Sequence, residues 1–133
     1  MAMSITKQAI DLGIITTNGP AMLAFYRDLL GLQFKGEMAM PGGGVMNRLL
    51  CGDSLIKLVV VPSVPAPAVP GGIGGGAGYR YWTITVSNLS EMVAACSAAG
   101  VKLVWPEREI RPGVKIAMVE DPDGNWVEFL QIA

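Results

Sequence analysis

The chain is built from two similar halves, and this duplication restricts its fold more than any other feature. Each half opens with a short apolar run, residues 10–16 in the first and residues 81–86 in the second. An asparagine ends each run, at Asn18 and Asn88, and its side chain is expected to cap a helix by accepting a hydrogen bond from the first turn. Both halves therefore begin with a strand that leads into a helix.

Apolar residues then recur with helical periodicity in both halves, and each helix is expected to end at a glycine. Gly31 and Gly100 suit the left-handed conformation that commonly terminates helices. Each glycine leads into an extended segment, after which two more strands are expected. These last strands are expected at residues 45–50, 55–61, 114–119 and 126–131. The sequence thus predicts an α+β fold made of two βαβββ modules.

The length of 133 residues fits one domain, with module one at about 8–61 and module two at 79–133. The connection, residues 62–78, is rich in proline and then in glycine. Proline stiffens a chain and glycine loosens it, so two interpretations stay open. The segment is either a plain linker or a lid across the mouth of a pocket.

The composition excludes several classes of function. With a net charge of −1 and 16% charged residues, the chain has no basic stripe for nucleic acid and no reason to bind a membrane. No apolar leader opens the sequence, which favours a cytoplasmic protein. Cys51 and Cys96 follow no metal-binding spacing and are expected to be reduced, buried thiols. The absence of histidine removes the commonest metal ligand and the commonest general base.

Motifs in both halves resemble one known superfamily. The stretches that carry the resemblance are residues 11–14, Asn18, residues 25–32, residues 81–86, Gly100 and residues 121–129. They are similar to the vicinal-oxygen-chelate superfamily, which contains glyoxalases, bleomycin-resistance proteins and ring-cleaving dioxygenases. The resemblance implies curved sheets around a cup-shaped cavity, a small-molecule ligand or substrate, and a homodimer in which modules pair within one chain or between two.

In enzymes of that superfamily, four side chains from the first and last strands of the modules hold a divalent metal. Carried over by position, they fall on Asp11, Lys57, Tyr81 and Glu128. Only Glu128 is a usual ligand of the family, and a lysine ammonium repels a cation. We therefore expect a cup without metal or other cofactor.

Two functions are compatible with such a cup, and the sequence favours the first, an enzyme, over the second, a binding protein. In a metal-independent enzyme of lyase, isomerase or hydrolase type, Asp11 or Glu128 is the general base, and Lys57 or Tyr81 donates a proton or a hydrogen bond. Alternatively, the protein sequesters a small hydrophobic or aromatic compound, as drug-resistance relatives do. Residues expected to contact the ligand are Trp126, Thr83, Arg48 and Met40.

Ordinary structural roles remain possible for several of these residues. Glu128 can pair with Lys57 as a structural ion pair, and Tyr81 can be a plain strand aromatic. Arg48 either anchors a substrate carboxylate or is solvated. Strand alternation places Tyr81 and Thr83 on one face and Trp82 on the other, where it is expected to pack against a helix.

Overall fold

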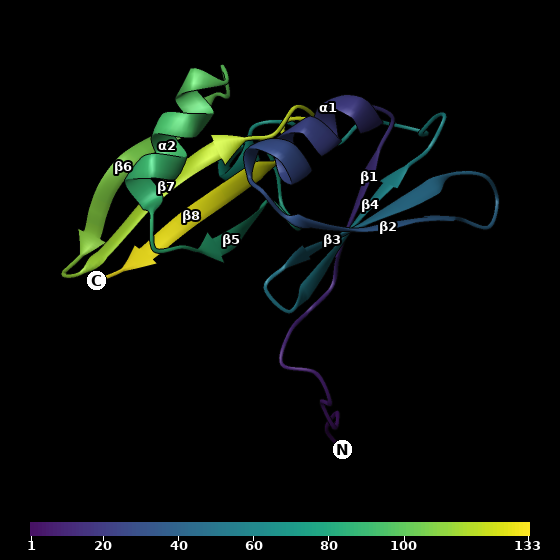
Figure 1. Cartoon of the computed structure of the whole chain (residues 1–133), viewed down its shortest axis with the longest axis horizontal. Helices are drawn as coiled ribbons and strands as arrows, with labels where there is room; N and C mark the ends of the chain where they lie inside the picture. Colours follow the sequence, from purple (N-terminus) through teal and green to yellow (C-terminus); the bar gives the residue numbers. More distant parts are fainter.

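Two four-stranded sheets lie side by side, and helices cover one face of each (Figure 1). The computed structural model describes residues 1–133. Module one consists of β1 (Leu12–Thr16), α1 (Gly19–Leu23), η1 (Ala24–Leu29), β2 (Gln33–Ala39), β3 (Val45–Cys51) and β4 (Ser54–Val60). After η2 (Gly72–Gly74), module two consists of β5 (Tyr81–Thr85), α2 (Leu89–Ala98), β6 (Leu103–Arg111), β7 (Val114–Glu120) and β8 (Trp126–Ile132).

Both sheets have the same strand order, which confirms the duplicated βαβββ fold. The orders are β1-β4-β3-β2 and β5-β8-β7-β6. In each module the first strand runs parallel to the last, and the other pairs are antiparallel. A parallel pair needs a long crossover connection, and the helix of each module supplies part of it. The strand orders place β1 and β5 at the edges of their sheets.

The helix boundaries agree with the sequence, but the expected side-chain caps are wrong. Neither Asn18 nor Asn88 makes a side-chain cap hydrogen bond. At the first helix, the Asn18 amide instead donates to the Thr16 hydroxyl (2.9 Å). At the second, the Gln131 side chain of the neighbouring strand accepts from the amide of the first helical residue (2.8 Å). A tertiary partner thus takes the place of the asparagine cap at the second helix.

The first helix is not one regular α-helix. After five α-helical residues the chain widens into the π-turns of η1, and the Leu30 amide bonds to the Phe25 carbonyl (2.9 Å). The wide turn keeps both Phe25 and Tyr26 buried, with their rings edge to face. Gly31 then ends the helix at a φ of 78°, as its position predicts.

One apolar core lies between the helices and the sheets and includes residues of both modules. Its largest fully buried side chains include Tyr26 and Phe129. Trp82 packs against this core, as strand alternation predicts. Cys96 is buried and Cys51 half-buried, and both thiols are free.

Two hydrogen bonds tie module one to the turn between β7 and β8. The Tyr26 hydroxyl donates to Asp121 (2.6 Å), and the Thr16 hydroxyl donates to Asp123 (2.5 Å). The Asp121 carboxylate also accepts three bonds from Asp123 and Asn125, which fix the turn. Burial, and then the charge of Asp121, raise the pKa of Tyr26 well above its ordinary value, and burial raises the pKa of Asp121.

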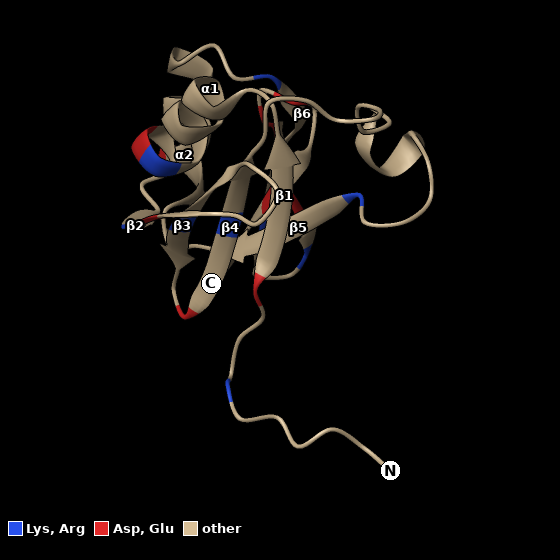
Figure 2. Ribbon diagram, turned by 90° about the vertical axis from the view of Figure 1, so that its right-hand side faces the viewer, with Lys and Arg blue, Asp and Glu red and all other residues tan.

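The linker between the modules is folded back onto module two. The loop is uncharged until it returns into β5 (Figure 2). There Arg80 donates to the carbonyls of Gly72 (2.6 Å), Val69 (2.9 Å) and Pro70 (3.2 Å). Gly72 is buried so closely against the Trp126 indole that a Cβ at this position would overlap the ring. The linker therefore has a defined path fixed by Arg80.

The longest helix, α2, has 10 residues, and none of the helices could span a lipid bilayer.

Candidate functional site

A mostly apolar cavity of about 440 Å³ lies where β1 meets β5, and we call it the seam cavity. Six of its eight lining residues are hydrophobic. The lining consists of Ile10, Leu12, Cys51, Ser54, Ile56, Tyr81, Trp82 and Thr83. Both neighbouring strands are edge strands, so each has a row of backbone groups without strand partners beside the cavity. Its volume falls within the range of small-molecule sites.

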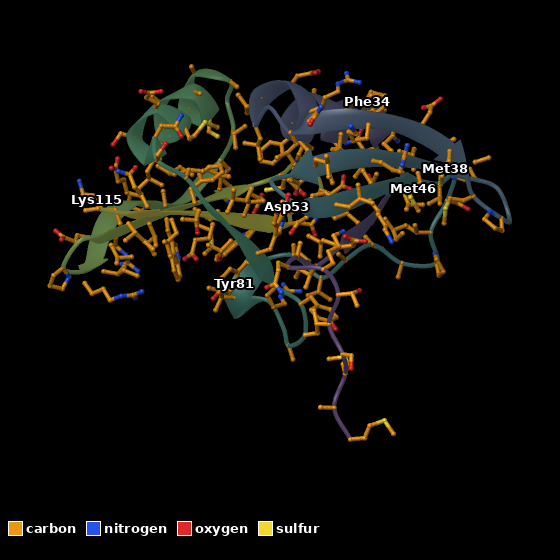
Figure 3. The ribbon with its side chains drawn as sticks, turned by 60° about the horizontal axis from the view of Figure 1, so that its bottom comes forward. Phe34, Met38, Met46, Asp53, Tyr81 and Lys115 are labelled. Carbon is orange, nitrogen blue, oxygen red and sulfur yellow. The ribbon has the colours of Figure 1, made fainter.

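Two of the residues expected from sequence, Tyr81 and Thr83, line this cavity. Tyr81 is 49% exposed and lies on β5, beside the incoming N-terminal segment (Figure 3). Thr83 donates its hydroxyl hydrogen to Glu128 on the neighbouring β8 (2.7 Å). Glu128 is thus the carboxylate connected to the cavity, and its partner is Thr83 rather than Lys57. The structural ion pair between Glu128 and Lys57 is therefore absent.

Asp11 and Lys57 form a second group, in which Lys7 lies closer to Asp11 than Lys57 does. Lys7 Nζ lies 2.7 Å from Asp11 Oδ1, and Lys57 Nζ lies 3.8 Å from Oδ2. The Leu55 amide also donates to Asp11 (3.3 Å). The hydrogen bond from Lys7 is the main cause that lowers the pKa of Asp11. An acid stabilised in its ionised form is a weaker base, which argues against Asp11 as the general base.

The four positions carried over from the family thus form two groups. No hydrogen bond or ion pair joins the Asp11–Lys57 group to Glu128. Tyr81 and Trp126 are register partners at the start of the parallel pair β5–β8. Trp126 donates its indole N–H to Glu120 (3.2 Å) and meets Trp105 edge to face at 6.2 Å.

The remaining two candidates, Arg48 and Met40, lie in module one and do not line the seam cavity. Arg48 is in β3 and donates through Nη2 to the Lys35 carbonyl (3.0 Å). Met40 is in the β2–β3 turn, where its amide bonds to the Gly44 carbonyl (2.9 Å). The sheet order separates β2 from β1 by two strands, so Met40 does not line the seam cavity.

Sequence reasoning missed most of the seam cavity. Leu12 and Ile56 are sequence neighbours of Asp11 and Lys57, and no role in the site was expected for either. Both are nonetheless part of the cavity lining, at the place where one sheet ends and the other begins. The cavity depends on how close the two edge strands lie to each other. The sequence pattern of either module does not specify this distance, so it could not predict the cavity.

Comparison with known proteins identifies the family. The family model for the Glyoxalase/Bleomycin resistance protein/Dioxygenase superfamily matches residues 9–129, and the chain belongs to this superfamily. Among curated protein sequences, none matches significantly.

Solved structures share the fold at low sequence identity. A glyoxalase family protein from Bacillus cereus is 18% identical with a TM-score of 0.83, over 99% of this chain and 98% of that one. TnmS3, an antibiotic binding protein from Streptomyces sp. CB03234, is 19% identical with a TM-score of 0.70, over 100% and 99%. Lactoylglutathione lyase from Agrobacterium tumefaciens is 22% identical with a TM-score of 0.65, over 92% and 91%.

The superfamily's divalent metal does not fit the residues present. Three or more His, Cys, Asp or Glu side chains nowhere form a cluster that could hold a metal ion. Of the four carried-over positions, Lys57 carries a positive charge and Asp11 is already bound by Lys7. Glu128 contributes one carboxylate, which accepts from Thr83. The residues at these four positions therefore do not form a metal site.

Proposed function

We propose that this protein binds a small, mostly apolar or aromatic molecule in the seam cavity, without a metal. The observation that carries the proposal is the cavity of about 440 Å³ with six hydrophobic residues among eight. Tyr81 and Trp82 offer aromatic surfaces, while Ser54 and Thr83 offer the few polar groups that orient a ligand. The fold shared with an antibiotic binding protein is compatible with this function.

The state of the acids favours binding over catalysis. Asp11 has a lowered pKa and a lysine on its carboxylate, so it is a weak base. Burial raises the pKa of Cys51, which keeps this cavity thiol protonated and poorly nucleophilic. The cavity wall therefore offers contact surface and hydrogen bonds rather than an activated group.

One observation supports a second candidate, an acid/base enzyme. Thr83 lines the cavity and its hydroxyl is hydrogen-bonded to Glu128 (2.7 Å). Glu128 could then accept a proton from a substrate held in the cavity, with Tyr81 donating to a developing oxyanion. Both functions place the small molecule in the seam cavity, but only catalysis requires the Glu128 carboxylate. Variants of Glu128 therefore distinguish the two functions.

The test is the binding of N-phenyl-1-naphthylamine, a neutral aromatic probe, followed by its fluorescence. We expect Tyr81→Ala to weaken binding about tenfold, because one aromatic side chain of the cavity wall is lost. This change corresponds to about 1.4 kcal/mol of binding free energy. Tyr79→Ala is the matched control, because Tyr79 is fully exposed and outside the cavity. Treatment with EDTA should leave the affinity unchanged.

Equal affinity of the Tyr81→Ala and Tyr79→Ala variants would refute binding in the seam cavity. Glu128→Gln should keep the affinity for the probe under both functions. If turnover of any carbonyl substrate is found and is lost in Glu128→Gln with binding intact, the acid/base enzyme replaces the binding protein.

A further inference from the structure

The proline-rich part of the linker, residues 62–70, is exposed along its whole length, and we call it the proline strap. Its four prolines, Pro62, Pro65, Pro67 and Pro70, form two Pro-x-x-Pro motifs. Residues 62–68 neither donate nor accept a hydrogen bond anywhere in the chain. The fold therefore makes no use of the backbone groups in this part of the strap.

Both ends of the proline strap are nevertheless fixed. Just before it, the Val61 amide donates to the Thr16 carbonyl (2.9 Å). At its end, Arg80 donates to the carbonyls of Val69 (2.9 Å) and Pro70 (3.2 Å). Proline also restricts its own φ to a value close to that of polyproline II. A segment held at both ends and stiffened within loses little conformational entropy when a partner binds it.

The second motif, Pro67 to Pro70, has the geometry of a recognition segment. The chain bends at Pro65 and Ala66 and then runs straight from Pro67 to Pro70. Polyproline II has three residues per turn, so Pro67 and Pro70 lie on the same side of this straight segment. The carbonyls of Pro67 and Ala68 accept no hydrogen bond in the chain. The segment thus presents two proline rings together with free acceptors.

The strap has no charge with which to attract a partner. Residues 58–79 include no charged side chain, and Figure 2 shows this loop without a charged residue until it returns into β5. Recognition must therefore depend on the apolar rings and the backbone acceptors. Aromatic grooves satisfy both, because flat rings pack against proline and tyrosine or tryptophan donates to a carbonyl.

We infer that the proline strap is a docking segment for a protein with an uncharged groove lined by aromatic side chains. Pro67 and Pro70 pack against the rings of the groove, and the carbonyls of Pro67 and Ala68 accept hydrogen bonds from it. This interaction goes beyond ligand binding in the seam cavity, because no residue of the strap lines that cavity.

The experiment is an NMR titration of the isotope-labelled full chain with the isolated SH3 domain of spectrin, since SH3 grooves are aromatic and accept Pro-x-x-Pro segments. We expect the amide signals of Ala66, Ala68 and Val69 to shift, while those of Tyr81 and Thr83 at the seam cavity stay in place. The control is the same SH3 domain with its groove tryptophan replaced by alanine, which should shift none of these signals.

Two variants of the chain test the motif itself. Pro67→Ala/Ala68→Pro keeps the number of prolines but destroys their spacing, and Pro67→Ala/Pro70→Ala removes both rings. Each should weaken SH3 binding at least about tenfold. Pro112→Ala is the matched control, because Pro112 is an exposed proline in the β6–β7 turn. Urea unfolding should give similar midpoints for all these chains, because the fold uses no hydrogen bond of residues 62–68.

Absence of SH3 binding, or equal affinity of the spacing variant and the unchanged chain, would overturn the inference. Sedimentation velocity of the chain alone tests a different occupant. A dimer that is lost in Pro67→Ala/Pro70→Ala would assign the strap to a second copy of the chain and would also overturn the inference. Binding of N-phenyl-1-naphthylamine in the seam cavity should persist in every strap variant, so the two proposals fail independently.

Discussion

At the scale of single residues, the immediate partners of an acid decide what it can do. Asp11 immediately precedes β1 and Glu128 lies in β8, and sequence alone makes both of them candidates for a general base. The structure gives Asp11 a lysine at 2.7 Å and gives Glu128 a threonine hydroxyl at the same distance. The ammonium of Lys7 stabilises the ionised form of Asp11, which makes Asp11 a weaker base.

Replacing Lys7 by Gln should raise the pKa of Asp11 toward its ordinary value. The hydrogen bond from Lys7 is the largest cause that lowers this pKa, whereas the charge of Lys57 is the smallest, so Lys57→Gln should raise it less. A lowered pKa means that Asp11 stabilises the fold above its ordinary pKa and loses this effect as the pH falls through the lowered value. The check is an NMR titration of the Asp11 carboxyl carbon, and an unchanged pKa in Lys7→Gln would contradict the assignment.

At the scale of elements, the linker behaves as a structured segment rather than as a loose connection. Gly71 and Gly72 have positive φ angles of 96° and 54°, and Arg80 holds three carbonyls of the segment. Gly72 contacts Trp126 at the start of β8, so the linker backbone packs against this strand. Tyr81 of β5 is the register partner of Trp126. The proline- and glycine-rich composition therefore serves close packing at this point.

Gly72→Ala should destabilise the protein by about 1–3 kcal/mol, because its Cβ would overlap the Trp126 ring and its φ disfavours a side chain. Gly74→Ala is the matched control in the same short turn, since its Cβ meets nothing within 4 Å and its φ is not positive. Urea unfolding followed by tryptophan fluorescence measures both variants. Similar stabilities of the two variants would show that the linker does not pack on Trp126.

At the scale of the whole molecule, the two modules share one core and two polar links. The core includes residues from both modules, among them Tyr26 and Phe129. Tyr26 and Thr16 in turn bind the two aspartates of the β7–β8 turn. Modules that share buried contacts of this kind are expected to unfold together.

We therefore expect one cooperative unfolding transition for the chain. All three tryptophans lie in module two, so their fluorescence reports that module, while far-ultraviolet circular dichroism reports both. Tyr26→Phe should lower the free energy of unfolding by about 1.5–3 kcal/mol, because a buried bond to a charged acceptor is lost. Both signals should shift together, and separate midpoints for the two signals would contradict a single unit.

The sequence by itself determined the duplicated βαβββ fold, the helix ends at Gly31 and Gly100, and the packed side of Trp82. These features depend on periodicity and backbone freedom, which are local properties of the chain. Only the tertiary structure decided that Gln131 caps the second helix, that Lys7 binds Asp11, and that the cavity lies between two edge strands. The physical reason is distance: hydrogen bonds, ion pairs and cavities depend on how elements remote in sequence meet, which local patterns do not specify.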